Sequence, residues 1–324
     1  MSLTQFSGGV SSMGIPFTSG INPFGTTYFV RASGGSDNND GLNADSAFAT
    51  IQKAIDTYAA GDTVVLSPGT HSVDVSTAAL VPLADTQFRA AIPPMGGKPS
   101  TIITHDADDG ANLVEIDVDG TGWYGIEFLI VTGSTTAINL IDVAQATAVN
   151  GLTFEDCWFN LNDVDLTASV TTAMLLDDAS VKTTGLVVRN CRFIGGDATT
   201  GTAQYIVNNA AGGVPDLLIE NCIFVLESAD SDCVGINLGD GVGAASNYGY
   251  VIRNNDFIGP KDYGKDAVGI YFAGSDLEQV GIMRHNYFAY CAAQAITADL
   301  VEKNCINNYY GDAAAGGTLV DPGT

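Results

Sequence analysis

Short apolar stretches recur along the chain, and in each one apolar and polar positions alternate around a polar bend. The five clearest copies are LTFEDCWF (152–159), LVVRNCRF (186–193), LLIENCIF (217–224), YVIRNNDF (250–257) and GIMRHNYF (281–288). Together with a weaker copy at Ile126, the equivalent positions 126, 157, 191, 222, 255 and 286 are separated by 31, 34, 31, 33 and 31 residues. Alternation with a period of two predicts short β-strands, and the regular spacing predicts a repeat architecture.

A second set of apolar positions interleaves with the first. These positions, 116, 141, 176, 207, 236, 270 and 296, step by 25, 35, 31, 29, 34 and 26 residues. Turns rich in Gly, Asn, Asp and Thr join the strands. One repeat cannot bury its apolar face alone, whereas stacked repeats pair their strands in parallel and share one continuous core. We therefore predict an all-β, single-stranded parallel β-helix of about seven or eight coils.

The region before the repeats has a different pattern. Residues Phe48, Ile51, Ala54, Ile55 and Tyr58 recur at helical spacing, which predicts a short helix over 48–58. Strands are predicted at 28–30 and 63–66 on either side of it. The chain thus divides into an extended N-terminal arm (1–27), an N-terminal cap of strand, helix and strand (28–79), the β-helix coils (80–310) and a C-terminal tail (311–324).

Stacking makes ladders of equivalent side chains. We expect the inward ladder to consist of small side chains that fill the interior: Cys157, Cys191, Cys222, Asn255 and Asn286. A buried Asn can form hydrogen bonds with its stacked neighbour and with the amides of the turn. Asn221 and its equivalents fall at the bend between two strands, where Asn tolerates the left-handed conformation.

Several stretches resemble a known class of proteins. YFV (28–30), GSDNNDG (35–41), AFATIQKAI (47–55) and GDTVVLSPGT (61–70) are similar to the N-terminal cap of right-handed parallel β-helix proteins of the pectate-lyase-like class, and the repeats resemble their coils. The arm GGVSSMGIPF (8–17) resembles the leader of phage-encoded β-helix virion proteins. This resemblance implies a right-handed helix and a head-decoration, fibre or spike protein, commonly a trimer; the same fold also serves lyases, hydrolases and adhesins.

Charge and composition exclude several other functions. The 324 residues contain 12 Lys+Arg and 37 Asp+Glu, a net charge of −25, which disfavours nucleic acid as a partner. No apolar stretch is long enough to span a membrane, and the first residues lack the pattern of an export signal. The six Cys contain no C-x-x-C pair, so we expect reduced thiols, with no disulfide scaffold and no zinc site.

Candidate chemistry is sparse. An enzyme would use the predicted carboxylate ladder Asp117, Asp142 and Asp177, continuing as Asn208 and Asn237, because crowded carboxylates can cleave a sugar or hold a cation. The alternative is a solvated outer face. The outward positions Glu155, Arg189, Glu220, Arg253 and Arg284 read as cross-strand ion pairs. Three His are expected to be structural, and the Asp37-to-Asp45 loop is either a calcium site or a turn that seals the cap.

These observations predict a non-enzymatic structural protein of a phage virion, assembled in the host cytoplasm, without cofactor or metal. Its expected partners are a capsid or tail protein, two further copies of itself in a homotrimer and possible host-surface glycans. The arm would anchor it through its apolar residues Phe6, Val10, Met13, Ile15, Phe17, Ile21 and Phe24. The alternatives are a carbohydrate-active enzyme, a tailspike glycosidase or polysaccharide lyase, and a glycan-binding adhesin, for which Trp158 and Tyr271 are candidate aromatic contacts.

Overall fold

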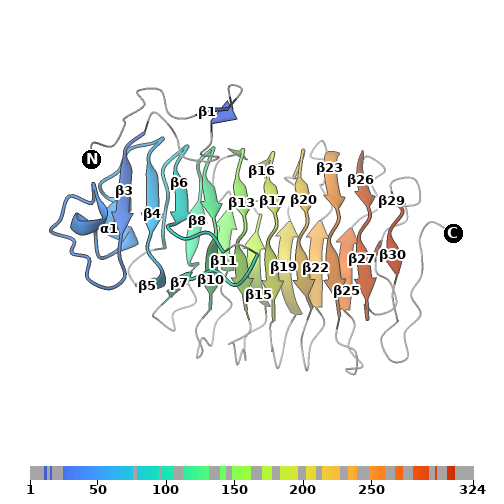
Figure 1. Ribbon diagram of the computed structural model, residues 1–324. Coiled ribbons are helices and arrows are strands. Elements are labelled where there is room, and N and C mark those ends of the chain that lie inside the picture. Colours follow the sequence, from blue (N-terminus) through green and yellow to red (C-terminus); the bar gives the residue numbers. More distant parts are fainter. Residues whose placement is uncertain are drawn as a thin grey trace.

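The computed structural model is an elongated stack of parallel β-coils that runs from the N-terminal cap to the C-terminal strands (Figure 1). It describes residues 11–12, 15–16, 25–75, 79–94, 96–105, 112–130, 139–143, 148–161, 170–176, 183–195, 202–208, 214–226, 233–238, 248–259, 267–272, 280–291, 296–297 and 305–310. The predicted all-β parallel β-helix is confirmed.

Three long parallel sheets form the sides of the stack. Sheet 1 contains β3 (Thr27–Val30), β4 (Thr63–Leu66), β6 (Gln87–Ala90), β9 (Gly122–Tyr124), β13 (Thr153–Glu155), β17 (Val187–Arg189), β20 (Leu218–Glu220), β23 (Tyr248–Arg253), β26 (Val280–Arg284) and β29 (Cys305–Ile306). Sheet 2 contains β5 (Gly69–Val73), β7 (Thr101–His105), β10 (Ile126–Leu129), β14 (Trp158–Asn160), β18 (Arg192–Ile194), β21 (Ile223–Val225), β24 (Asp256–Ile258), β27 (Tyr287–Ala289) and β30 (Tyr309–Tyr310). Sheet 3 contains β8 (Val114–Ile116), β11 (Asn139–Val143), β15 (Val170–Leu175), β19 (Thr202–Asn208), β22 (Cys233–Leu238), β25 (Ala267–Phe272) and β28 (Ile296–Thr297).

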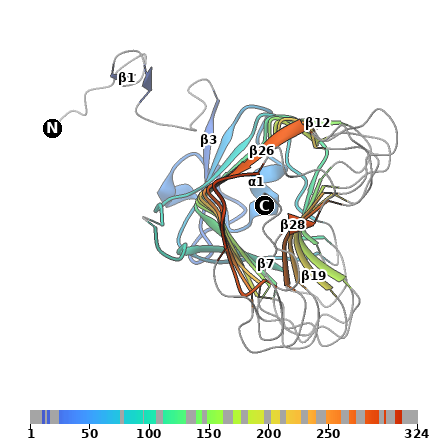
Figure 2. The same cartoon turned by 90° about the vertical axis from the view of Figure 1, so that its right-hand side faces the viewer.

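The coil is right-handed. Each turn passes from sheet 1 to sheet 2, then to sheet 3 and back to sheet 1. Figure 2 looks along the stack from its C-terminal end, and in this view the path runs anticlockwise while the chain advances toward the viewer. A short parallel pair, β12 (Val149–Asn150) and β16 (Thr183–Thr184), adds to the corner before sheet 1.

The corner between sheets 1 and 2 is made by one left-handed residue. Positive φ angles occur at Asp156 (56°), Asn190 (54°), Asn221 (56°), Asn254 (56°), His285 (55°) and Asn307 (50°), one in each successive coil. Asp and Asn enter this region at the lowest cost among non-glycine residues. The prediction that Asn221 lies at a left-handed bend is confirmed.

A column of phenylalanines runs through the interior beneath sheet 2. Phe128, Phe159, Phe193, Phe224, Phe257 and Phe288 are fully buried, and neighbouring rings stack with centroids 5.3, 4.7, 4.6, 4.6 and 4.9 Å apart. The strand register aligns them, pairing Phe159 with Phe193 and Phe193 with Phe224. Residues more than thirty positions apart therefore become direct neighbours, as the repeat spacing predicts.

The inward polar ladder after the bend is buried and internally satisfied. Cys157, Cys191 and Cys222 give way to Asn255 and Asn286, both fully buried. Asn255 donates through Nδ2 to the Ile219 carbonyl (3.1 Å) and to Asn286 Oδ1 (3.0 Å), while its Oδ1 accepts from the Cys222 amide (2.8 Å). Asn286 donates in the same way to the Ile252 carbonyl and to Asn308 Oδ1. Stacking thus provides each buried amide with hydrogen-bond partners, as predicted.

The N-terminal cap closes the first coil. Helix α1 (Ile51–Ile55) is shorter than the predicted 48–58; Thr50 caps its start by accepting from the Lys53 amide, and the chain leaves the helix at Asp56. A short 3₁₀ helix, η1 (Ala44–Ser46), precedes it. Asp37 binds back to the helix start, accepting from the Ala49 and Thr50 amides (2.8 and 3.0 Å). The Asp37-to-Asp45 loop therefore uses these oxygens to seal the cap.

The arm lies mostly outside the described residues. Two described pieces, β1 (Ser11–Ser12) and β2 (Ile15–Pro16), pair as an antiparallel hairpin. The chain joins the stack at Thr26, whose amide donates to Asp62 (2.7 Å) and whose carbonyl accepts from Thr63 (2.9 Å). None of the helices in the described ranges has the length and apolar character needed to cross a membrane.

The phenylalanine column predicts that substitutions on the two faces of one strand differ strongly in their effect on the free energy of unfolding. Phe224→Ala should lower the free energy of unfolding by about 3–5 kcal/mol, because it opens a cavity between two stacked rings. Ile223→Ala, on the outward face of the same strand, should cost about 1 kcal/mol or less. Urea denaturation followed by circular dichroism measures both, and equal losses would contradict the interior column.

Candidate functional site

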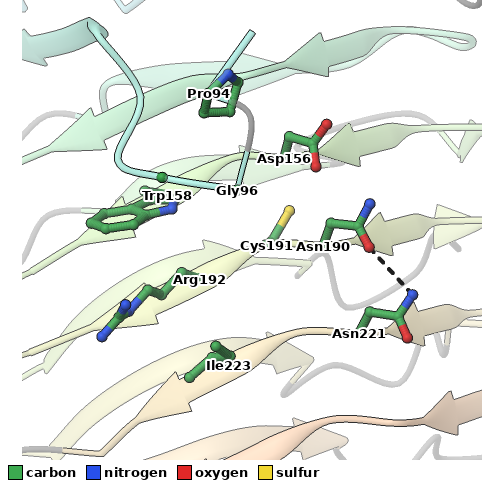
Figure 3. A pocket seen from close by; sticks show the side chains of 10 residues that line it. Pro94, Gly96, Asp156, Trp158, Asn190, Cys191, Arg192, Asn221 and Ile223 are labelled. Carbon is green, nitrogen blue, oxygen red and sulfur yellow. Dashed lines mark hydrogen bonds between the residues drawn. The ribbon is translucent and has the colours of Figure 1, made fainter.

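A groove lies on the outside of the stack at the corner between sheets 1 and 2 (Figure 3). Its volume is about 110 Å³. The lining comes from the corner residues of three successive coils and from a loop that crosses over them: Pro94, Gly96, Gly97, Asp156, Trp158, Asn190, Cys191, Arg192, Asn221 and Ile223. The loop follows β6 and returns to β7, so residues from distant coils meet here.

The two sides of the groove differ chemically. On one side lie the Trp158 indole and the Arg192 guanidinium, whose Cζ is 5.0 Å from the centre of the Trp158 ring (Figure 3). On the other side lie Asp156, Asn190 and Asn221, where Asn221 Nδ2 donates to Asn190 Oδ1 (3.3 Å). The left-handed backbone at these three positions sets their side chains at the corner. The groove is therefore aromatic and cationic along one wall and rich in amide and carboxylate groups along the other.

An ion pair between the exposed Lys98 and the buried Glu127 holds the crossing loop in place. Lys98 Nζ lies 3.0 Å from Glu127 Oε1, and the Glu127 side chain is 0% exposed although it points outward from sheet 2. Asn160 Nδ2 donates to the same oxygen (2.9 Å). Within the loop, the Gly97 amide donates to the Pro94 carbonyl (2.7 Å), which closes a tight turn. The loop is thus fixed to the coil beside Trp158.

Ion pairs continue along the outer face of sheet 1 beside the groove. Arg189 Nε lies 2.6 Å from one Glu220 oxygen, and Arg253 Nη2 lies 2.5 Å from the other. Burial opposes ionisation of Glu220, but hydrogen bonds from the two guanidinium groups outweigh it and hold the pKa of this carboxyl below its usual value. The predicted cross-strand pairing of Glu155, Arg189, Glu220 and Arg253 is confirmed, with Glu155 at 4.0 Å from Arg189.

A second polar cluster lies on sheet 3 and its flanking turns. Asn112 Nδ2 donates to Asp142 Oδ2 (2.5 Å) and to Glu115 Oε1 (3.2 Å), so that one amide bridges two carboxylates. Asn139 Nδ2 in turn donates to Asn112 Oδ1 (2.9 Å). Asp142 is 3% exposed. Two carboxylates held by a common amide on adjacent coils have the components that acid–base chemistry on a sugar requires.

The register corrects the predicted carboxylate ladder. Asp142 pairs with Glu115 on one side and with Leu175 on the other, so Asp117 lies two positions further along its coil. Asn237 pairs with Val207 rather than Asn208. Asp177 lies outside the described residues. The alignment of the repeats failed here because the turns between coils differ in length, which shifts the strands by one or two residues; Glu115 was missed for the same reason.

The remaining candidate residues have structural positions. Cys157, Cys191, Cys222, Cys233 and Cys291 are free and buried, and burial raises the pKa of Cys157 and Cys191 well above its usual range and that of Cys291 to about 12. The His71 ring binds the Ser67 carbonyl at 2.9 Å, and burial lowers its pKa. Among the residues that the structure describes, no three His, Cys, Asp or Glu side chains are grouped so as to hold a metal ion.

Comparisons with known proteins find similar solved structures at low sequence identity. No protein-family model and no curated protein matches the chain. Among solved structures, a rhamnogalacturonan lyase is similar at 16% identity and a TM-score of 0.39, covering 91% of this chain and 65% of that one. The pectin methylesterase of Aspergillus niger is similar at 15% identity and a TM-score of 0.41 (94% and 90% covered), and ORF18 of Geobacillus virus E2 at 14% and 0.33 (89% and 62%).

These likenesses concern the pectate-lyase-like β-helix fold alone, since all identities are far below 25%. The chain spans 65% of the length of the rhamnogalacturonan lyase. Most of the similar structures are enzymes, which contradicts the prediction that this protein is not one. That prediction relied on the absence of a local acid–base motif in the sequence, whereas stacking brings Glu115 and Asp142 together from different coils.

The loop over the groove should depend on its ion pair. Lys98→Met leaves the Glu127 carboxylate buried without its cation and should lower the free energy of unfolding by about 2 kcal/mol. The double variant Lys98→Met/Glu127→Gln should recover much of this loss, and Lys53→Met on α1 should change stability by less than about 0.5 kcal/mol. Urea denaturation measures the stability of all three variants. A double variant that is less stable than Lys98→Met would refute the pairing.

Proposed function

We propose that this protein is a projecting β-helix of a phage virion, a spike, fibre or head decoration, that is attached through its N-terminal arm. The observation that carries the proposal is the place where the arm joins the stack. β3 is the end strand of sheet 1, so residues before it leave from one end of the rod. An arm in this position holds the rod end-on and leaves its long sides accessible.

The composition of the arm supports this role. Seven large apolar residues occur within the first 24 positions (Phe6, Val10, Met13, Ile15, Phe17, Ile21 and Phe24). Such residues lower the free energy of a chain when another protein surface buries them. The net charge of −25 keeps the exposed rod soluble and repels nucleic acid. A capsid or tail protein is the proposed partner, and a homotrimer is the proposed assembly.

Removal of the arm tests the attachment. Because Gly25 packs against Gly61 and Thr26 is hydrogen-bonded to Asp62, a deletion of residues 1–24 should leave the coils folded. We expect the truncated protein to keep the circular dichroism spectrum of the full chain and to lose association with phage particles in co-sedimentation.

The matched control keeps the length of the arm and changes its chemistry. Replacing its seven large apolar residues by Ser should abolish association as the deletion does, because the contact is apolar. Particle association that survives both changes, in proteins that remain folded, would disprove attachment through the arm.

A second candidate function is cleavage of a polysaccharide. The specific observation in its favour is the pair Glu115 and Asp142, bridged by the Asn112 amide. Two carboxyl groups on adjacent coils fit the acid and base, or acid and nucleophile, of sugar-bond hydrolysis. This activity is compatible with a virion location, because an appendage that meets a host surface first encounters its polysaccharide.

Charge-neutral variants test this candidate. If the pair is catalytic, Asp142→Asn and Glu115→Gln should each lower the release of reducing ends from host capsular polysaccharide by about 100-fold or more. Asp117→Asn is the matched control, because Asp117 lies two positions beyond Glu115 and is not paired with Asp142, and it should retain activity. Equal effects of all three variants, or no activity in the unmodified protein, would reject the pair as catalytic.

A further inference from the structure

We propose that the groove beneath the 92–98 loop is a binding site for one neutral sugar ring of a glycan. This goes beyond the attachment role above and uses neither the arm nor the carboxylate pair on sheet 3. The inference rests on the two unlike walls of the groove, on the Arg192 side chain that lines it, on its size and on its local charge.

The two walls match the two kinds of surface on a sugar ring. A pyranose has C–H faces that pack on an aromatic side chain and a rim of hydroxyl groups that both donate and accept hydrogen bonds. Trp158 and Ile223 offer the apolar contacts, and the Asp156 carboxylate and the Asn190 amide offer an acceptor and a donor. A purely apolar ligand would leave these polar groups without partners, at a cost in affinity.

Arg192 places a cation along the groove. Its guanidinium lies over Trp158, the residue lines the groove, and its Nε is buried. The N–H groups of a guanidinium at the groove can donate hydrogen bonds to a hydroxyl group of a sugar. In contrast, the Arg189 and Arg253 guanidinium groups nearby are engaged by Glu220. Of these three arginines, Arg192 is the one that lines the groove and is positioned to contact a ligand.

The size and charge of the groove narrow the ligand class. A volume of about 110 Å³ is well below the range of about 300–1,000 Å³ typical of sites that enclose a drug-sized molecule. It accommodates one ring, with the rest of a glycan in solvent. Asp156 lies in the groove, and the chain as a whole carries a charge of −25. Asp156 offsets the positive charge of Arg192 within the groove, and the negative charge of the whole chain repels an anionic sugar, so a neutral ring is favoured.

Tryptophan emission provides a direct readout. The chain has only two Trp residues, and Trp123 is fully buried in the core, where it stacks on Phe88 at 4.0 Å. Trp158 therefore reports on the groove. The full chain is titrated with D-glucose, D-galactose, D-mannose, L-rhamnose and N-acetyl-D-glucosamine, and with D-galacturonic acid as the anionic probe. We expect a saturable emission change with at least one neutral sugar, with a dissociation constant in the millimolar range, because one ring makes few contacts.

Variants show which residues produce the emission change and which contribute to the affinity for the sugar. Trp158→Phe should abolish the emission change while Trp123 still emits. Arg192→Met and Asp156→Asn should each weaken binding at least about fivefold in saturation-transfer NMR; Asn fits the left-handed backbone at 156, so the second variant keeps the fold. Tyr309→Ala is the matched control, an exposed aromatic on the same sheet outside the groove, and should bind as the unmodified protein does.

The possible results separate clearly. Binding of a neutral sugar that is lost with Trp158, Arg192 or Asp156 and kept in Tyr309→Ala supports the site. The proposal is overturned if no neutral sugar gives a saturable change, if galacturonic acid binds more tightly than every neutral sugar, or if Arg192→Met and Asp156→Asn bind like the unmodified protein. None of these outcomes depends on particle association, so the attachment role is tested separately.

Discussion

The structure depends on one backbone constraint, the single left-handed residue at the corner between sheets 1 and 2. In an extended strand alternate side chains point to opposite faces. A left-handed residue at Asp156, Asn190 or Asn221 turns the chain and resets this alternation. As a result, Phe154 before the corner and Phe159 after it are both buried. Repetition of the same corner in the coils from Asp156 to Asn307 aligns these rings and the Cys and Asn ladder into continuous interior columns.

The same corner also shapes the outer surface. Because left-handed positions favour Asn and Asp, the corner carries an amide or carboxylate group in five of the six coils with such a residue, and His285 occupies it in the sixth. The loop that crosses the corner, held by Lys98 and Glu127, encloses these groups at one place and joins them to Trp158 and Arg192. A binding groove can thus arise from a feature whose first role is to build the fold.

Stacking separates the possible functions in space. The arm joins the coils at the end of sheet 1, the groove lies at the corner between sheets 1 and 2, and the amide-bridged carboxylates lie on sheet 3. A rigid rod can therefore be attached at its end while both lateral sites stay accessible. This arrangement explains why attachment to a particle and chemistry on a polysaccharide do not exclude each other.

The sequence determined the architecture, because the residues of each repeat specify its strands and its bend without reference to distant parts of the chain. The Phe column, the buried Asn255 and Asn286, the bend at Asn221 and the Glu220 ion pairs all follow from aligning the repeats at the corner, because the phrase of strand, bend and strand has the same length in the five clearest repeats. Only the tertiary structure decided the register of sheet 3 and the path of the 92–98 loop. Turns of unequal length precede sheet 3, so Asp142 meets Glu115 and not Asp117. The groove is lined by Gly97 and Trp158, some sixty residues apart, and no local pattern encodes this proximity.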